Sequence, residues 1–404
     1  MFLDHRLPSW IRANYYYDSL GGLFYGAFYG LAISFFPYVA RKIGAEDFSL
    51  ALLTASTFIG ALLAAYWGHR SSKLTRKVSF IVKIKVAARI FLAVLIGISS
   101  LPAFYITVIL IYWIIEFIAD PAYAQTMKEI YPGAHRGRAL GYVRTEMALV
   151  AIVFTYLGGV LLDITSYRII FPLGAGLGIL SSLSFRKIKE DFSNKKKVGA
   201  AAPSSSFFRT IKLPLRDKRF LLYTSISFLG GAGSLLVLPL YPIYLVSYLN
   251  FSNYSIGKLG ALFSLMWMFS YIFWGEILAG KKPTYVLAFV YILASLVPLF
   301  YYIERNIWFL AVASSLSGFT SGGLDLGRIT YITRNYSIQK LPFYSGADTS
   351  FMGIRGIIFP FMGIGLMRLW GIKTAFLFAF LFMLVSGVLT WYLKNKLEGS
   401  EEEN

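Results

Sequence analysis

Several charged residues lie inside long apolar runs, where a charge is costly and therefore informative. Arg89, Glu116 and Arg355 lie near the middle of such runs. Others lie closer to one end of their run: Asp120, Arg144, Glu146, Asp325 and Arg328. If these runs cross a membrane, each charge costs about 2.5–3.5 kcal/mol at the centre of a helix on insertion scales. Such residues pair with one another or mark the path of a solute or an ion.

Glu116 and Arg355 suggest two different kinds of chemistry. A nearby cation can switch a carboxyl group that is held away from water between its neutral and charged forms, so Glu116 is the candidate for carrying a proton. A guanidinium binds a carboxylate or a phosphate in a forked geometry, so Arg355 is the candidate for holding an anionic group. The alternative for Glu116 is a permanent ion pair with Arg89. Lys83 and Lys85 lie near the end of their run, and we expect them to extend to the interface.

Small and aromatic residues alternate in the first apolar run, "GLFYGAFYG". Gly22, Gly26 and Gly30 recur every four residues and predict a smooth helix face for close packing. Tyr25 and Tyr29 are also four residues apart and are candidates for offering hydroxyl groups to a bound molecule. Aromatic packing is the alternative for both tyrosines.

The elements that must position these residues are membrane-spanning helices. Of the 404 residues, 57% are hydrophobic and 15% are charged, whereas soluble domains carry about 25% charged residues. Apolar stretches of about 20 residues, each long enough to cross the hydrocarbon core, recur along the chain. The sequence predicts an all-α polytopic membrane protein with twelve spans, at 17–41, 49–68, 78–101, 103–127, 139–163, 168–185, 220–247, 255–279, 284–303, 306–332, 345–367 and 372–393.

Lysine and arginine are distributed unevenly between the predicted loops. If the N-terminus is inside, most of the 39 Lys and Arg residues fall in the inner loops and tails. This bias predicts that both termini lie in the cytoplasm and that the protein resides in the cell (inner or plasma) membrane. The net charge of +19 then reflects topology, and no nucleic-acid partner is expected.

An internal repeat divides the chain into two halves. A shift of 205 residues pairs Asp120 with Asp325 and Gly158 with Gly363, among other matches from several spans. Two six-helix repeats are therefore predicted. The expected parts are a first bundle at 1–185, a basic cytoplasmic linker at 186–219, a second bundle at 220–394 and an acidic cytoplasmic tail at 395–404.

Two cytoplasmic loops carry a pattern that resembles a known family. "GHRSSKLTRK", residues 68–77, is similar to the signature loop of the major facilitator superfamily, Gly-x-x-x-Asp-(Arg/Lys)-x-Gly-Arg-(Arg/Lys). Gly68, Lys73, Arg76 and Lys77 fit this loop, whereas Ser72 replaces the Asp.

The second loop, "EIYPGAHRGRALGYVR", begins at residue 129. Glu129 followed by Arg136-Gly137 looks like the family's Glu-x6-Arg-Gly. The resemblance implies two parallel six-helix halves that work by alternating access. It also implies that spans 1, 4, 7 and 10 line a central cavity. The candidates on these spans are Glu116, Asp120, Asp325 and Arg328, with Arg144 and Arg355 on lateral spans.

The charged loops predict a cytoplasmic gate. Glu129 can pair with Arg136 or with the cations at 70–77, and Asp120 can replace the carboxylate that is missing at Ser72. Exposed ion pairs contribute only about 0–1 kcal/mol each, which suits a gate that opens repeatedly. The alternative is that these cations only mark the cytoplasmic side. The expected gate residues are Gly68, Lys73, Arg76, Lys77, Asp120, Glu129 and Arg136.

The function that we expect is secondary active transport, by symport or antiport, of a small polar or anionic solute, coupled to protons. A multidrug or metabolite exporter is the alternative, and a non-transporting scaffold or sensor with the same fold is an alternative of another class. The sequence has no cysteine, three scattered histidines and no phosphate-binding loop. We therefore expect no enzyme activity, no metal and no cofactor. Its expected surroundings are the lipid bilayer, and a monomer is expected.

Overall fold

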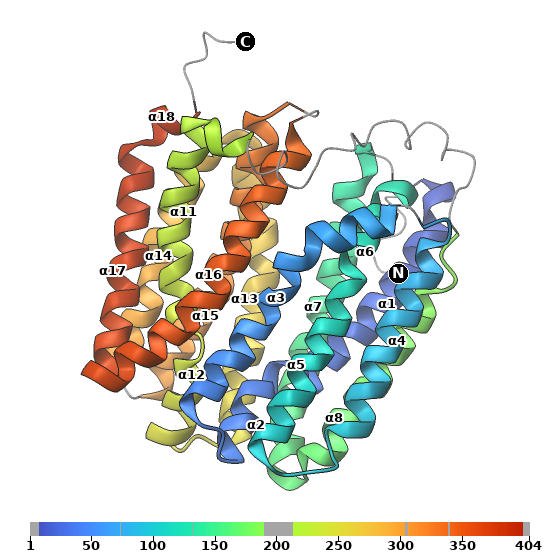
Figure 1. Ribbon diagram of the computed structural model, residues 1–404, viewed down its shortest axis with the longest axis vertical. Coiled ribbons are helices and arrows are strands. Elements are labelled where there is room, and N and C mark those ends of the chain that lie inside the picture. The colour runs from blue at the N-terminus through green and yellow to red at the C-terminus, as the bar shows by residue number, and fades with distance from the viewer. Residues whose placement is uncertain are drawn as a thin grey trace. The chain divides into compact units, whose positions relative to one another are not determined.

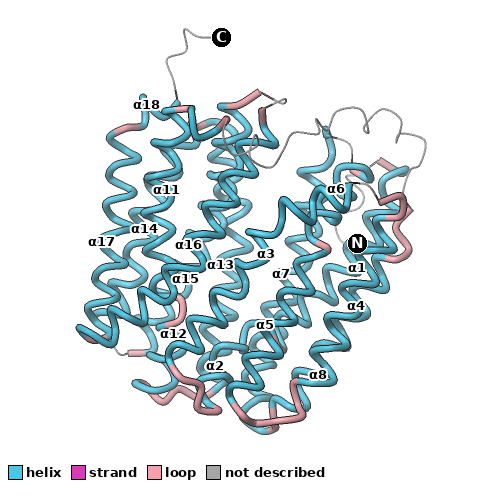
Figure 2. The backbone as a smooth tube through the Cα atoms, in the orientation of Figure 1, coloured by secondary structure: helices cyan, strands magenta, loops and turns pink. Residues whose placement is uncertain are grey.

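A computed structural model of the chain describes residues 8–72, 74–131, 133–189, 213–303, 306–337 and 340–398. Throughout these residues the regular structure is helical (Figures 1 and 2). Parts of three predicted segments lie outside the described residues, namely the linker at 190–212, the tail at 399–404 and the gate residue Lys73.

Ten helical segments among the described residues are long and apolar enough to cross a membrane. They are Ile11–Lys42, Pro102–Ile130, Ala139–Ile164, Tyr167–Phe185, Lys218–Tyr248, Asn253–Gly280, Pro283–Ile303, Ile307–Asn335, Phe343–Trp370 and Ile372–Tyr392. The other two predicted spans form the helices α3 (Asp47–Ser72) and α4 (Lys77–Leu95). The prediction of an all-α, multi-pass membrane protein is confirmed.

The chain forms two compact units. Unit 1 consists of Met1–Gly44, Leu63–Ser205 and Ser252–Ala261. Its helices are α1 (Ser9–Leu31), α2 (Phe36–Lys42), α4, α5 (Pro102–Ile118), α6 (Asp120–Ile130), α7 (Gly133–Ile164) and α8 (Tyr167–Phe185), with the end of α3 and the start of α13 (Asn253–Gly280). Helix α1 packs against α7 and α8. A Cβ atom at Gly26 would overlap with the backbone of Met147 in α7, so the predicted smooth face is the face that packs.

The fourth predicted span is broken between Glu116 and Asp120, two of the candidate site residues. Helix α5 ends at Ile118 and α6 begins at Asp120, directly before Pro121. Proline has no N–H to donate to the preceding turn, and its ring clashes with that turn, so a helix breaks or kinks there. The break leaves Glu116 on one segment and Asp120 on the other.

Unit 2 consists of Ala45–Leu62, Ser206–Phe251 and Leu262–Asn404. It contains the first part of α3, α11 (Lys218–Val237), α12 (Leu240–Pro242), η4 (Ile243–Tyr248), most of α13, α14 (Pro283–Ile303), α15 (Ile307–Asn335), α16 (Leu341–Trp370), α17 (Ile372–Tyr392) and α18 (Lys394–Glu398). Helix α14 packs against α15 and α17, and α11 packs against α16 and α17. In the same unit α3 contacts α16, where Gly356 leaves room for the ring of Phe58.

Candidate functional site

A cavity of about 340 Å³ lies within unit 1. Its charged lining comes from five helices, and acidic and basic side chains are equal in number. They are Asp18 of α1, Lys85 and Arg89 of α4, Glu116 of α5, Asp120 of α6 and Arg144 of α7. Aromatic side chains complete much of the wall: Tyr25, Trp113, Phe117, Tyr123 and Phe185. The cavity is therefore charged and aromatic at once, although it lies among membrane-spanning helices.

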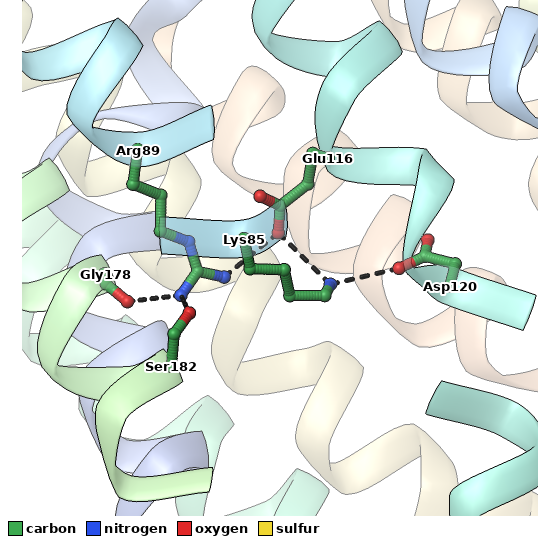
Figure 3. Close-up of polar contacts among 6 residues, drawn as sticks. All are labelled: Lys85, Arg89, Glu116, Asp120, Gly178 and Ser182. Carbon is green, nitrogen blue, oxygen red and sulfur yellow. Dashed lines mark hydrogen bonds and ion pairs between the residues drawn. The ribbon is translucent and has the colours of Figure 1, made fainter. Parts of the chain in front are cut away.

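A buried ion pair between Arg89 and Glu116 forms one side of the cavity (Figure 3). Arg89 Nη2 lies 3.0 Å from Glu116 Oε1, and the two residues are 2% and 3% exposed. Arg89 Nη1 also donates to the carbonyl oxygen of Gly178 and, at 2.6 Å, to Ser182 Oγ. The ring centroids of Tyr25 and Phe28 lie 5.5 Å and 5.7 Å from the guanidinium carbon of Arg89. The ion pair that the sequence allowed for Glu116 is thus formed.

Lys85 belongs to the same network, so the expectation that it extends to the interface is wrong. Its Nζ lies 3.2 Å from Glu116 Oε1 and 3.0 Å from Asp120 Oδ1 (Figure 3). Lys83 is exposed, as expected. Residues two apart point to different sides of a helix, whereas residues four apart share a face. Lys85 and Arg89 are four residues apart, as are Glu116 and Asp120, and this double spacing is the signal that could have identified Lys85.

Asp18 is a cavity residue that sequence reasoning missed. It is 4% exposed and accepts a hydrogen bond of 2.9 Å from the hydroxyl of Tyr131. Within the part of the chain that the structure describes, it has no ion-pair partner within 4.0 Å. It lies at the beginning of the first apolar run, where a charge costs little if the helix begins at that point and leaves the side chain in water. Helix α1 begins instead at Ser9 and buries this residue.

Of the other unit 1 candidates, Tyr25 and Arg144 line the cavity, whereas Tyr29 is not among the lining residues. Glu146 is 1% exposed and accepts hydrogen bonds from Ser19 and, at 3.0 Å, from Tyr15. These contacts tie α7 to α1 and leave Glu146 outside the lining of the cavity.

Two of the predicted gate residues, Lys77 at the start of α4 and Glu129 near the end of α6, lie together in the same unit. Lys77 forms an ion pair with Glu129, and their side chains are 10% and 18% exposed. Glu129 therefore pairs with a cation of the 68–77 loop, one of the two predicted arrangements. The side chain of Arg136 in α7 lies outside the described residues, as does all of Lys73.

Three further gate candidates are placed differently. Gly68 lies within α3, and Arg76 is an exposed residue directly before α4. Asp120 pairs with Lys85 in the cavity, and among the described cations of the loop none is its ion-pair partner. Asp120 begins α6, whereas the loop cation Lys77 pairs with Glu129 near the other end of that helix.

The remaining candidates belong to unit 2. Arg328 Nη1 lies 3.3 Å from Asp348 Oδ2, a buried carboxylate that sequence reasoning missed. Arg355 Nη1 donates to the carbonyl oxygen of Ser227, and its guanidinium fills the space beside Gly231.

Asp325, the repeat partner of Asp120, accepts a hydrogen bond of 3.1 Å from Tyr271. The two aspartates are thus equivalent in the repeat but differ in their surroundings. Among the described residues no group of three or more His, Asp or Glu side chains is placed to hold a metal ion.

Comparisons with known proteins agree with this architecture. The family model of the Major Facilitator Superfamily matches residues 19–305 and 226–404. The multi-drug resistance efflux pump PmrA of Streptococcus pneumoniae, found in two strains, is 25% identical over 202 residues. This match covers 48% of the chain and 49% of the relative, so the chain spans about half the length of the curated relatives it matches.

A crystal structure of the nucleoside transporter NupG superposes with a TM-score of 0.71 at 12% identity. The match covers 94% of this chain and 99% of that chain, and at this identity it shows the fold alone. The family model covers the chain from its first span to its end. The chain belongs to the Major Facilitator Superfamily.

Proposed function

We propose that this protein is a secondary active transporter that moves a small polar or anionic solute by alternating access, coupled to protons. The observation that carries the proposal is the cavity of unit 1, in which charged side chains from five helices meet. Charged residues within membrane spans face a bundle interior or a water-filled cavity and mark substrate and ion pathways. The family supplies the transporter fold, and the cavity supplies the reason to expect a polar cargo.

The size and lining of the cavity support a small solute. Ligand pockets usually measure about 300–1,000 Å³, and the cavity of about 340 Å³ lies at the lower end of that range. Lys85 and Arg144 supply cationic groups for a carboxylate or a phosphate, while Trp113 and Tyr123 supply flat apolar surface. Arg355, in unit 2, stays our candidate for a further contact with an anionic group.

We assign the coupled proton to Asp18 rather than to Glu116. Glu116 is held by Arg89 at 3.0 Å and by Lys85 at 3.2 Å, and these cations stabilise its charged form. Asp18 is equally buried, and no cation lies within ion-pair distance of it among the described residues. The hydroxyl of Tyr131 donates to it at 2.9 Å, and Tyr123 and the charge of Arg144 also act on it. A buried carboxylate without a cation in direct contact is costly, so we expect a change in hydration during the transport cycle to exchange its proton.

A second candidate function is the export of structurally diverse compounds. It is supported by the printed name of the PmrA relative, a multi-drug resistance efflux pump, and by the aromatic wall of the cavity. For either function we propose the plasma membrane as the location, with both termini in the cytoplasm and a monomer as the working unit.

A ligand screen tests the proposal. The detergent-purified protein is heated with nucleosides, amino acids, sugars, organic anions and cationic drugs, and any compound that binds the native state raises the melting temperature. We expect a small polar or anionic compound to raise it and Trp113→Ala to abolish the effect. Stabilisation by cationic drugs alone favours the exporter. The non-transporting scaffold is favoured if no compound stabilises the protein and if cells that carry Lys85→Gln or Asp18→Asn grow like cells that carry the wild-type protein.

A further inference from the structure

Helix α6 is attached to α4 by ion pairs at both of its ends. At the cavity end, Asp120 Oδ1 lies 3.0 Å from Lys85 Nζ. At the other end, Glu129 is paired with Lys77. Between these ends, the buried side chains of Ala122, Met127 and Ile130 pack into the core of unit 1. The two ion pairs therefore add a polar contact at each end of α6 to this apolar packing.

The ion pair at the cavity end also crosses the break in the fourth span. The Lys85 ammonium binds Asp120 on α6 and, at 3.2 Å, Glu116 on α5 (Figure 3). Ala119 is the one residue between the two helices. A single side chain of α4 thus holds one carboxylate on each side of this break.

The two bonds of Lys85 differ in how easily they are exchanged. The Glu116 side chain is 4% exposed, and it is also held by Arg89. The Asp120 side chain is 47% exposed and, within the described residues, Lys85 is its ion-pair partner. Exposed ion pairs contribute little to stability and are readily replaced. The bond to Asp120 is the one that a change in the cavity can break.

We propose that Lys85 is a positioning residue that fixes the angle between α5 and α6, and that loss of Asp120 from its ammonium frees α6 to turn at Ala119. Such a turn moves Glu129 relative to Lys77, so the state of the cavity is transmitted to the far end of the span. The inference rests on the proposed function, because it assigns a transport step to a cavity residue. The alternative is that Lys85 only neutralises Glu116, in which case its loss lowers stability and leaves the angle unchanged.

The angle can be measured directly because the chain contains no cysteine. Thr107→Cys on α5 and Lys128→Cys on α6 place spin labels at two exposed positions on opposite sides of the break. Pulsed electron paramagnetic resonance on the full-length protein in nanodiscs then gives the distribution of distances between the labels. This measurement needs neither a solute nor transport, so its failure is distinguishable from failure of the proposed function.

We expect Lys85→Gln and Asp120→Asn each to broaden or shift the distance distribution relative to the wild-type protein. Lys85→Arg keeps the positive charge and should give the wild-type distribution. Lys83→Gln is the matched control, since Lys83 is an exposed lysine on the same helix, and it should leave the distribution unchanged. Asp120→Asn alters a half-exposed side chain and keeps the Lys85–Glu116 pair, so it decides the matter if Lys85→Gln does not fold. A distribution that Asp120→Asn leaves unchanged overturns the proposal, whatever Lys85→Gln does.

Discussion

Two cations of α4, Lys85 and Arg89, meet at one buried carboxylate, Glu116. Both Arg89 and Lys85 bind its Oε1 atom, and Arg89 is anchored in addition on Gly178 and Ser182. Removing one member of a buried pair leaves an uncompensated charge, which costs about 3–5 kcal/mol. The network is therefore a structural element as well as part of the cavity wall.

Arg89→Gln should lower the free energy of unfolding of the purified protein by about 3 kcal/mol, because Glu116 then keeps only the partly exposed Lys85. Adding Glu116→Gln to the same chain should recover part of this loss. Thermal unfolding followed by tryptophan fluorescence measures both effects. Strictly additive losses from the two substitutions would contradict the pairing.

The sequence alone predicts some of the charged residues that line the cavity of unit 1. Glu116, Asp120 and Arg144 stood out because they are charged and lie within apolar runs. Lys85 and Asp18 were lost because each lies near the end of a run, and position along a run does not show which way a side chain points. That direction depends on how α4 and α1 pack, which requires the three-dimensional structure.

At the scale of elements, short polar segments fix the ends of long apolar helices. The pair of Lys77 with Glu129 joins α4 to α6, and α18 performs a comparable task in unit 2. There the Glu398 carboxylate accepts hydrogen bonds from the backbone N–H and the hydroxyl of Thr284 at the start of α14. Leu397, 1% exposed, is buried beside it.

Glu129→Lys should reduce the rate of solute transport several-fold while the protein still inserts into the membrane, because insertion depends on the spans rather than on this pair. Lys77→Glu in the same chain reverses the pair and should recover most of the rate. Transport by membrane vesicles, normalised to the amount of inserted protein, provides the measurement. Full activity of Glu129→Lys alone would reduce this segment to a marker of topology.

Glu398→Ala should destabilise unit 2 by about 1 kcal/mol, the usual cost of losing a side chain that caps the start of a helix. Lys396→Ala removes an exposed side chain from the same short helix and serves as the control. The two melting temperatures are compared in the same detergent. Equal values would show that the contact between Glu398 and Thr284 contributes nothing.

The positions of most helices follow from apolar runs, but their interruptions do not. The run at 103–127 was predicted as one helix, whereas Pro121 divides it into α5 and α6. Proline is also found inside helices of this chain, as at Pro172 in α8. A proline by itself therefore does not predict a break, and the packing partners of the segment decide.

At the scale of the whole molecule, the family and the helical architecture were readable from composition, repeat and loop motifs. The two compact units were not, because each is discontinuous in sequence and includes part of a helix that begins or ends in the other. Such an arrangement depends on tertiary contacts between residues far apart in the chain, which a pattern of apolar runs does not contain.

The predicted topology has a direct test. Ser100→Cys lies at the predicted outer end of the span 78–101 and Lys128→Cys in the predicted inner loop that follows the span 103–127, and both positions are exposed. A thiol reagent that does not cross membranes should label Ser100→Cys in intact cells and Lys128→Cys only after the cells are broken. The natural chain has no cysteine, so it gives no background. The opposite labelling pattern would place both termini outside.

In the proposed transporter, the cavity of unit 1 couples the movement of a solute to protons. The deciding measurement is accumulation of the solute identified by the ligand screen in proteoliposomes with an imposed pH gradient. The wild-type protein should concentrate the solute, whereas Asp18→Asn should exchange preloaded solute at a comparable rate without concentrating it. Accumulation by Asp18→Asn equal to that of the wild type would contradict the assignment of the proton, and accumulation that ignores the pH gradient in the wild type would contradict the coupling itself.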